Sequence, residues 1–396
     1  MNKIILFIAF SFMAFQLNAQ FKVIARGPSF EEPETGYAKI LFMKNKNTVY
    51  VHVTPKEGIK LKVYDAEHKQ ILSKVVNHKF GKLKGLNVEG CFEISKNITL
   101  LVSEYDERTP VLYRIILDGQ TGNLVSQEEI AKLSKITWGA AYAMQYGGVK
   151  MPDFIIRKDP MSENYTVTTF NTFASERDRR IEVIHYNNEH KEVSKGYLST
   201  PEDKYKYVNI LDIAVMGDKE AYVLIYGFNT ARSGGKEGEL FVANFKNNTE
   251  NAEFISLTTD EGEVSTQGIL KYNKTDGKLY AVTQVQSEQK KKGFFGNSGG
   301  KVYYDIGYHI IDPKSKSSVV GPEIDFSGIN KKFSETFGEK KEYSGVLQNF
   351  YLNDDGSYSF VFEGLVVDVT TRISASSSQT TVTYQLGDIA VLNYNQ

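Results

Sequence analysis

The chain has 396 residues, with 48 Asp or Glu against 47 Lys or Arg, and a formal net charge of −1. A charge this close to zero gives no electrostatic basis for binding nucleic acid or an anionic membrane surface. Cys91 is the only cysteine, so an internal disulfide is excluded and stability must come from packing.

The first residues have the pattern of an export signal. Lys3 is basic, residues 4–15 are apolar but too few to span a bilayer, and residues 17–19 end on the small side chain of Ala19. We therefore predict a signal peptide over 1–19. The segment resembles the leaders of exported proteins of Gram-negative bacteria, which implies a periplasmic or extracellular location. No later stretch is long and apolar enough to predict a membrane span.

Residues 20–36 are predicted to form an N-terminal strand, Phe21–Arg26, and a linker. From 37 to 396 a pattern of strands occurs six times. The second strand of each unit is predicted at 47–53, 97–103, 164–170, 220–226, 277–284 and 356–362. The apolar third strand is predicted at 60–66, 112–118, 181–187, 240–245, 308–312 and 388–394.

Each second strand contains one large anchor residue, and a first and a fourth strand complete most units. The anchors are Tyr50, Leu101, Tyr165, Tyr222, Tyr280 and Tyr358. One four-stranded unit cannot bury its own faces, so repeated units must stack. We therefore predict an all-β fold, a β-propeller of about six four-stranded blades. A β-sandwich or two stacked sheets is the alternative.

A short motif supports the propeller prediction. Tyr64 and Asp65 precede a polar turn and a short strand, and residues 117–122 (LDGQTG) repeat this arrangement. The motif resembles repeats of TolB-type and pyrroloquinoline-quinone-type propellers, and the resemblance covers most of the chain. It implies a propeller fold and carries over no catalytic residue.

The sixth unit ends with its third strand. Either Phe21–Arg26 pairs with residues 388–394 as the missing outer strand and closes the ring, or the sequence is the N-terminal part of a longer surface protein. Elsewhere, we expect a short helix at 127–134, a short helix or a loop at 330–342, and a loop at 372–380.

Motifs for metal or cofactor chemistry are scarce. His185 and His190 are five residues apart across a turn, which is not a metal-binding pattern. Residues 293–301 are rich in glycine but lack the spacing of a phosphate-binding loop. We therefore predict no metal and no cofactor.

Polar residues mark the first strands, which line the central channel of a propeller. Asp212 and Arg157 lie further along two of these strands. Those near the strand starts are Lys39, Glu89, Asp153, Asn209, Gln267 and Gln348. Together they predict a polar funnel that binds a small molecule, a glycan or a peptide.

Three classes of function remain open. The absence of catalytic spacing favours a non-catalytic binding or scaffold protein of the bacterial cell envelope, with a protein of the envelope as a further partner. The second class is an envelope hydrolase or lyase acting on glycans or peptides, with Asp153 and Glu89 as acid and base. The third is a structural part of a longer surface protein.

Overall fold

The computed structural model describes most of the chain. The described residues are 35–76, 86–140, 142, 151–201, 204–229, 238–246, 252–259, 264–289, 301–324, 326–338, 343, 345–353, 355, 357–374 and 377–394. Within these, only the backbone is described at 266, 286–289, 301–304 and 365–386.

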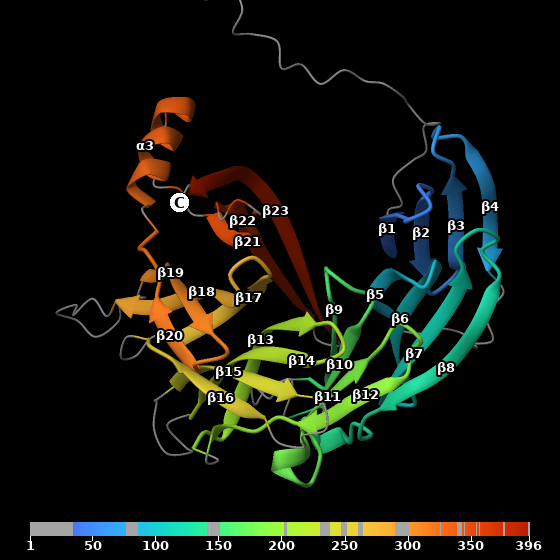
Figure 1. Cartoon of the computed structure of the whole chain (residues 1–396), viewed down its shortest axis with the longest axis horizontal. Helices are drawn as coiled ribbons and strands as arrows, with labels where there is room; N and C mark the ends of the chain where they lie inside the picture. The colour runs from blue at the N-terminus through green and yellow to red at the C-terminus, as the bar shows by residue number, and fades with distance from the viewer. Residues whose placement is uncertain are drawn as a thin grey trace, which may run out of the picture. The chain divides into compact units, whose positions relative to one another are not determined.

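The chain divides into two compact units. Unit 1 comprises Met1–Glu104 and Tyr113–Glu128, and unit 2 comprises Tyr105–Leu112 and Glu129–Gln396. Each unit is built from small sheets whose strands follow one another in chain order (Figure 1).

Unit 1 is built on two four-stranded sheets, and the ends of the second sheet extend into unit 2. The first sheet contains β1 (Tyr37–Phe42), β2 (Thr48–Thr54), β3 (Gly58–Tyr64) and β4 (Gln70–Val76). The second contains β5 (Asn87–Ile94), β6 (Asn97–Asp106), β7 (Thr109–Asp118) and β8 (Leu124–Lys132). The first strands of the two sheets, β1 and β5, are neighbours.

Unit 2 continues with three four-stranded antiparallel sheets. They contain β9 (Asp153–Lys158), β10 (Tyr165–Phe170), β11 (Ile181–Tyr186) and β12 (Glu192–Tyr197); β13 (Tyr207–Met216), β14 (Glu220–Phe228), β15 (Gly238–Lys246) and β16 (Glu253–Leu257); and β17 (Val264–Asn273), β18 (Lys278–Gln289), β19 (Lys301–Asp312) and β20 (Ser317–Val320). A single-turn 3-10 helix, η1 (Arg177–Arg179), precedes β11.

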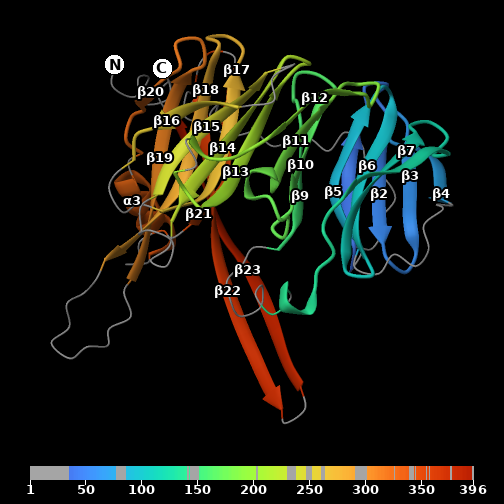
Figure 2. The same cartoon turned by 90° about the horizontal axis from the view of Figure 1, so that it is seen from below.

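The last sheet of unit 2 has three strands and follows the helix α3 (Phe326–Phe337). Its strands are β21 (Gly345–Leu352), β22 (Tyr358–Ser374) and β23 (Ser377–Tyr394). Figure 2 shows β22 and β23 continuing as a long two-stranded hairpin beyond β21. The first strands β9, β13, β17 and β21 are neighbours in that order.

The fold class is the one predicted, an all-β chain of blade-like sheets of the β-propeller type. All six predicted second strands and all six third strands are present, and each anchor residue lies in a second strand. The region 330–342 is helical where α3 covers it. The proposed closing strand Phe21–Arg26 lies outside the described residues.

Two local predictions are wrong. Residues 127–132 continue β8 rather than forming a helix, because strand pairing in the sheet outweighs the weak helical propensity of a short charged segment. The expected loop at 372–380 is the end of the β22–β23 hairpin, where Ser374 is paired with Ser377. Its threonine-rich sequence has high strand propensity.

The turn between β7 and β8 shows how the repeated motif works. One carboxylate oxygen of Asp118 accepts hydrogen bonds from the backbone of Gln120 at 3.0 Å and of Thr121 at 2.7 Å. These bonds, with one from the Thr121 hydroxyl, lower the pKa of Asp118. Gly122 adopts a φ of 62°, which glycine tolerates best. Asp118 and Gly122 therefore fix a tight connection to the outer strand.

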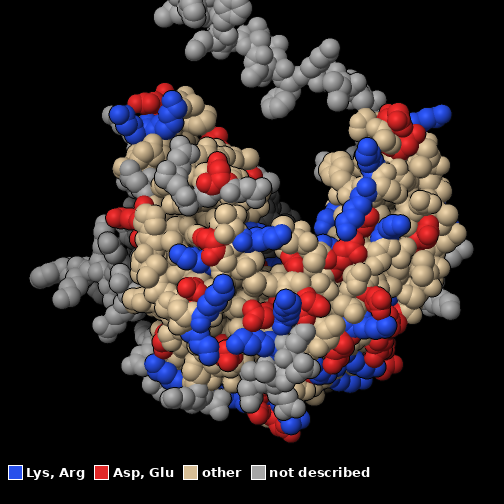
Figure 3. Space-filling view, in the orientation of Figure 1, with Lys and Arg blue, Asp and Glu red and all other residues tan. Residues whose placement is uncertain are grey.

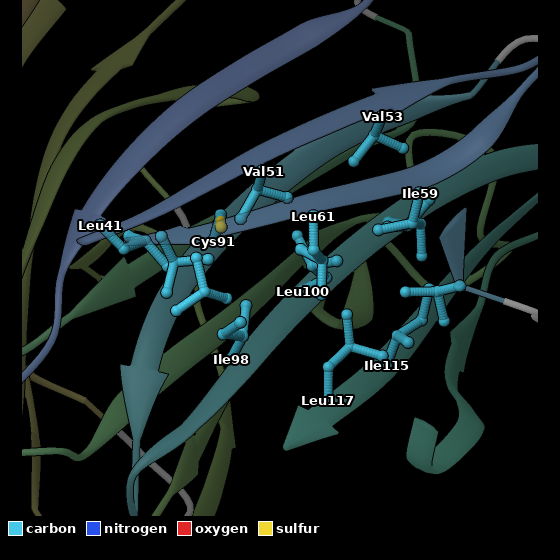
Figure 4. Packing of buried hydrophobic residues seen from close by; sticks show 14 of the residues in the cluster. Leu41, Val51, Val53, Ile59, Leu61, Cys91, Ile98, Leu100, Ile115 and Leu117 are labelled. Atoms are coloured by element: carbon cyan, nitrogen blue, oxygen red, sulfur yellow. The ribbon is translucent and has the colours of Figure 1, made fainter. Parts of the chain in front are cut away.

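The sheets are held together by apolar side chains that alternate along the strands. In unit 1 the cluster in Figure 4 includes Val51, Leu61, Leu100, Ile115 and the thiol of Cys91, all fully or almost fully buried. The described part of unit 2 shows three further clusters, in which the anchors Tyr222 and Tyr280 are also buried. These cores fix the faces of the first strands that remain open to solvent.

Candidate functional site

Four of the first strands carry a β-bulge. At a bulge, one strand of a pair has one residue more than its partner between two paired positions. The extra residue falls between Val88 and Gly90 in β5, between Ile210 and Asp212 in β13, between Ser265 and Gln267 in β17, and between Leu347 and Asn349 in β21. A bulge redirects side chains and is common next to functional sites. Three of these four bulges lie on neighbouring strands of unit 2.

A pocket of about 480 Å³ lies at these three bulges. Its walls come from β9, β13, β17 and β21, so it belongs entirely to unit 2. The lining residues are Arg157, Ile210, Leu211, Asp212, Gln267, Gly268, Ile269, Lys271, Leu347, Gln348 and Asn349. Its volume lies in the range of small-ligand sites.

Asp212 is the best-fixed polar group of the pocket. One carboxylate oxygen accepts a hydrogen bond from Nε of Arg157 at 2.7 Å, and the other accepts one from the backbone N–H of Leu270 at 2.9 Å. The Asp212 residue is only 8% exposed, while the Arg157 side chain is 46% exposed. Asp212 on β13 therefore connects β9 to β17.

The other polar lining groups are less constrained. Oδ1 of Asn349 accepts the N–H of Phe350 at 2.8 Å, which leaves the amide nitrogen for other partners. Gln267 and Gln348 are exposed, and Lys271 is partly buried. Within the described part of the chain, the Lys271 ammonium makes no hydrogen bond or ion pair. The pocket thus combines two cations, one carboxylate and three amides.

All the residues predicted for the polar funnel lie in first strands, and some of them line the pocket of unit 2. Asp212, Gln267 and Gln348 line the pocket together with Arg157. The other four are not among the lining residues: Asn209 lies in β13, Asp153 in β9, and Lys39 and Glu89 in unit 1.

Local contacts engage most of the residues outside the pocket. Oδ1 of Asp153 accepts the N–H of Phe154 at 2.8 Å. The Lys39 ammonium donates to the carbonyl of Cys91 at 2.8 Å, and Glu89 accepts a hydrogen bond from the hydroxyl of Ser103. Asp153 and Glu89, the expected acid and base, belong to different units.

Sequence analysis missed Lys271 and Asn349. The prediction took one polar residue near the start of each first strand, whereas Lys271 lies further along β17 and Asn349 directly follows Gln348. A visible signal was the three-residue spacing of Leu347 and Phe350, which are both buried in β21. In a regular strand, side chains three apart point to opposite faces.

Charges on the face of the protein seen in Figure 3 are mixed, with acidic and basic side chains interspersed. Across the described residues, no three His, Cys, Asp or Glu side chains gather closely enough to hold a metal ion. No helix in the same part of the chain has the length and apolar character needed to cross a membrane.

Neither a family model nor a curated protein matches this chain. Solved structures do match. A levansucrase of B. megaterium is 10% identical, with 72% of this chain and 82% of that chain covered and a TM-score of 0.34. A polysaccharide lyase is 9% identical, with 81% and 75% covered and a TM-score of 0.37. A prolyl endopeptidase is 12% identical, with 88% and 50% covered and a TM-score of 0.36.

These similar structures are enzymes, and they contradict the prediction of a non-catalytic binding or scaffold protein. That prediction rested on the missing catalytic motifs, yet the groups of an enzyme site can come from separate strands without any motif in the sequence. With such low identities and TM-scores, no residue role is transferred from the similar structures to this chain.

Proposed function

We propose that this protein is a glycan-cleaving enzyme of the hydrolase or lyase class, and that its substrate enters the pocket of unit 2. The observation that carries the proposal is the pocket built by three bulged strands, with six polar side chains among its lining residues.

The chemistry of the lining suits a sugar. Each sugar hydroxyl both donates and accepts a hydrogen bond, and the pocket offers amides, cations and a carboxylate that supply both roles. Ile210, Leu211 and Ile269 add apolar surface for the carbon face of a sugar ring. A few polar groups in a partly apolar pocket are typical of a site that orients a small ligand.

Lys271 and Asp212 are the groups of the pocket that can exchange a proton with a substrate. Both carboxylate oxygens of Asp212 already accept hydrogen bonds, whereas the Lys271 ammonium is not engaged by the described residues. We therefore assign proton transfer to Lys271 and the ordering of the site to Asp212.

The proposal also includes export. The leader pattern at 1–19 supports it, and a glycan-cleaving enzyme of this kind would meet its substrate outside the cytoplasm. Intact-mass measurement of the secreted protein should show a chain that begins at Gln20. Recovery of a chain that retains residues 1–19 would contradict export.

Release of reducing ends from a panel of plant, algal and bacterial polysaccharides tests the activity. Wild-type protein should release them from at least one polysaccharide, and Lys271→Ala should reduce the rate by roughly 100-fold, as expected for a group in proton transfer. Lys274→Ala is the matched control, because Lys274 is an exposed lysine in the turn after β17 and does not line the pocket. Absence of cleavage across the panel would overturn the proposed function.

A further inference from the structure

The pocket carries more positive than negative charge, although the whole chain is slightly acidic. Among the described lining residues, the two cations Arg157 and Lys271 are accompanied by one carboxylate, Asp212, which already accepts hydrogen bonds from Arg157 and from the N–H of Leu270. A ligand that enters the pocket therefore meets two cationic groups, and the one acidic side chain among the described lining residues is already engaged.

Asp212 also determines where the two cations lie. It fixes Arg157 of β9 through Nε, and it fixes the backbone of β17 through Leu270, the residue directly before Lys271. Nη1 of Arg157 donates to the carbonyl of Ile156 at 2.9 Å. This leaves Nη2 of Arg157 on a half-exposed side chain, while Lys271 lines the pocket from β17.

Amide donors complete the lining. The amide nitrogens of Asn349, Gln267 and Gln348 can donate to an anion, and the described lining residues include no second carboxylate that would repel it. Charge-assisted hydrogen bonds from Arg and Lys to a carboxylate are about twice as strong as neutral ones. The site is therefore better suited to a carboxylate than to a neutral sugar.

We propose that the pocket recognises the carboxylate of a uronic acid residue in the glycan, with Arg157 and Lys271 as its cationic partners. This inference rests on the proposed function and adds the substrate class. A sulfate ester is the other anion that such cations could bind, so a sulfated glycan serves as the comparison.

Matched polysaccharides test the inference. Uronate-containing polysaccharides of several linkage types are compared with their carboxyl-reduced counterparts, which keep the linkage and lose the charge, and with a sulfated neutral galactan. Binding and reducing-end release should be strongest for a uronate polysaccharide. Both should fall by on the order of tenfold or more on carboxyl reduction, the change that corresponds to one lost charged contact.

Variants locate the effect. Lys271→Gln should remove most of the preference for the uronate form, Lys271→Arg should retain the preference in binding, and the control Lys274→Gln should leave it unchanged. Loss of preference in the control variant, or equal preference in Lys271→Gln, would overturn the assignment of Lys271.

The two proposals fail separately. Preferred cleavage of a neutral or a sulfated glycan would overturn the uronate inference and leave the glycan-cleaving function intact. No cleavage of any polysaccharide would overturn the function itself. Ultraviolet absorbance from an unsaturated product would identify elimination, whereas reducing ends without it would identify hydrolysis.

Discussion

At the scale of single residues, Asp212 is the pocket residue whose side chain connects two neighbouring strands by hydrogen bonds. Its removal in Asp212→Ala leaves the buried N–H of Leu270 without an acceptor and Arg157 without its partner. An unsatisfied buried donor costs about 1–3 kcal/mol, and the half-exposed Arg157 adds little. Urea denaturation should therefore show a loss of about 1–3 kcal/mol in the free energy of unfolding. An unchanged midpoint would contradict the role given to this carboxylate.

His309 in β19 gives a second prediction, on pH dependence. It is 3% exposed, its Nδ1 has no hydrogen-bond partner among the described residues, and burial lowers its pKa. In the unfolded chain a histidine takes up a proton near pH 6.5, whereas the folded protein resists protonation until lower pH. The contribution of neutral His309 to the stability of the folded protein is thus complete above about pH 6.5. It is lost as the pH falls toward the lowered pKa of His309 in the folded protein.

Replacement of His309 should reduce the dependence of protein stability on pH between neutral and mildly acidic pH. Thermal melts between neutral and mildly acidic pH should show a smaller drop in Tm for His309→Leu than for wild type. His68→Asn is the control, because His68 is exposed and its φ of 62° is one that Asn tolerates. An equal drop in both variants would rule out His309 as the source.

At the scale of elements, the strands were predictable and the bulges were not. Tyr222 and Tyr280 lie in runs whose apolar pattern and flanking turns identify a strand from the sequence alone. The position of Lys271 on the pocket wall depends on the bulge between Ser265 and Gln267, which is set by pairing with β18. Such pairing involves residues distant in the chain, so local sequence patterns do not contain it.

The bulge in β21 is itself testable. Gln348 is the extra residue, and Leu347 and Phe350 on either side of it both point into the core. Deletion of Gln348 restores two-residue alternation and keeps both apolar side chains inside, so the sheet should still form. It also removes one pocket amide and shifts Asn349. We expect a native-like circular dichroism spectrum with a clear loss of glycan binding; retained binding would show that the bulge does not shape the site.

At the scale of the whole molecule, the chain passes between the two units more than once. Strand β7 begins in unit 2 and continues in unit 1, because the division falls between Leu112 and Tyr113. A strand is stable only while its neighbours in the sheet are paired. We therefore expect unit 1 to lose its structure together with unit 2 rather than in a separate step.

The reactivity of Cys91 can show whether unit 1 unfolds together with unit 2. Cys91 is fully buried in the core of unit 1, and burial raises the pKa of its thiol to about 12, so the thiolate that reacts with alkylating reagents is scarce in the folded protein. Labelling of Cys91 across a urea series should begin in the same concentration range in which circular dichroism, dominated by the four sheets of unit 2, loses its strand signal. Labelling that precedes this loss would show that unit 1 unfolds on its own and that the shared strand does not couple the two units.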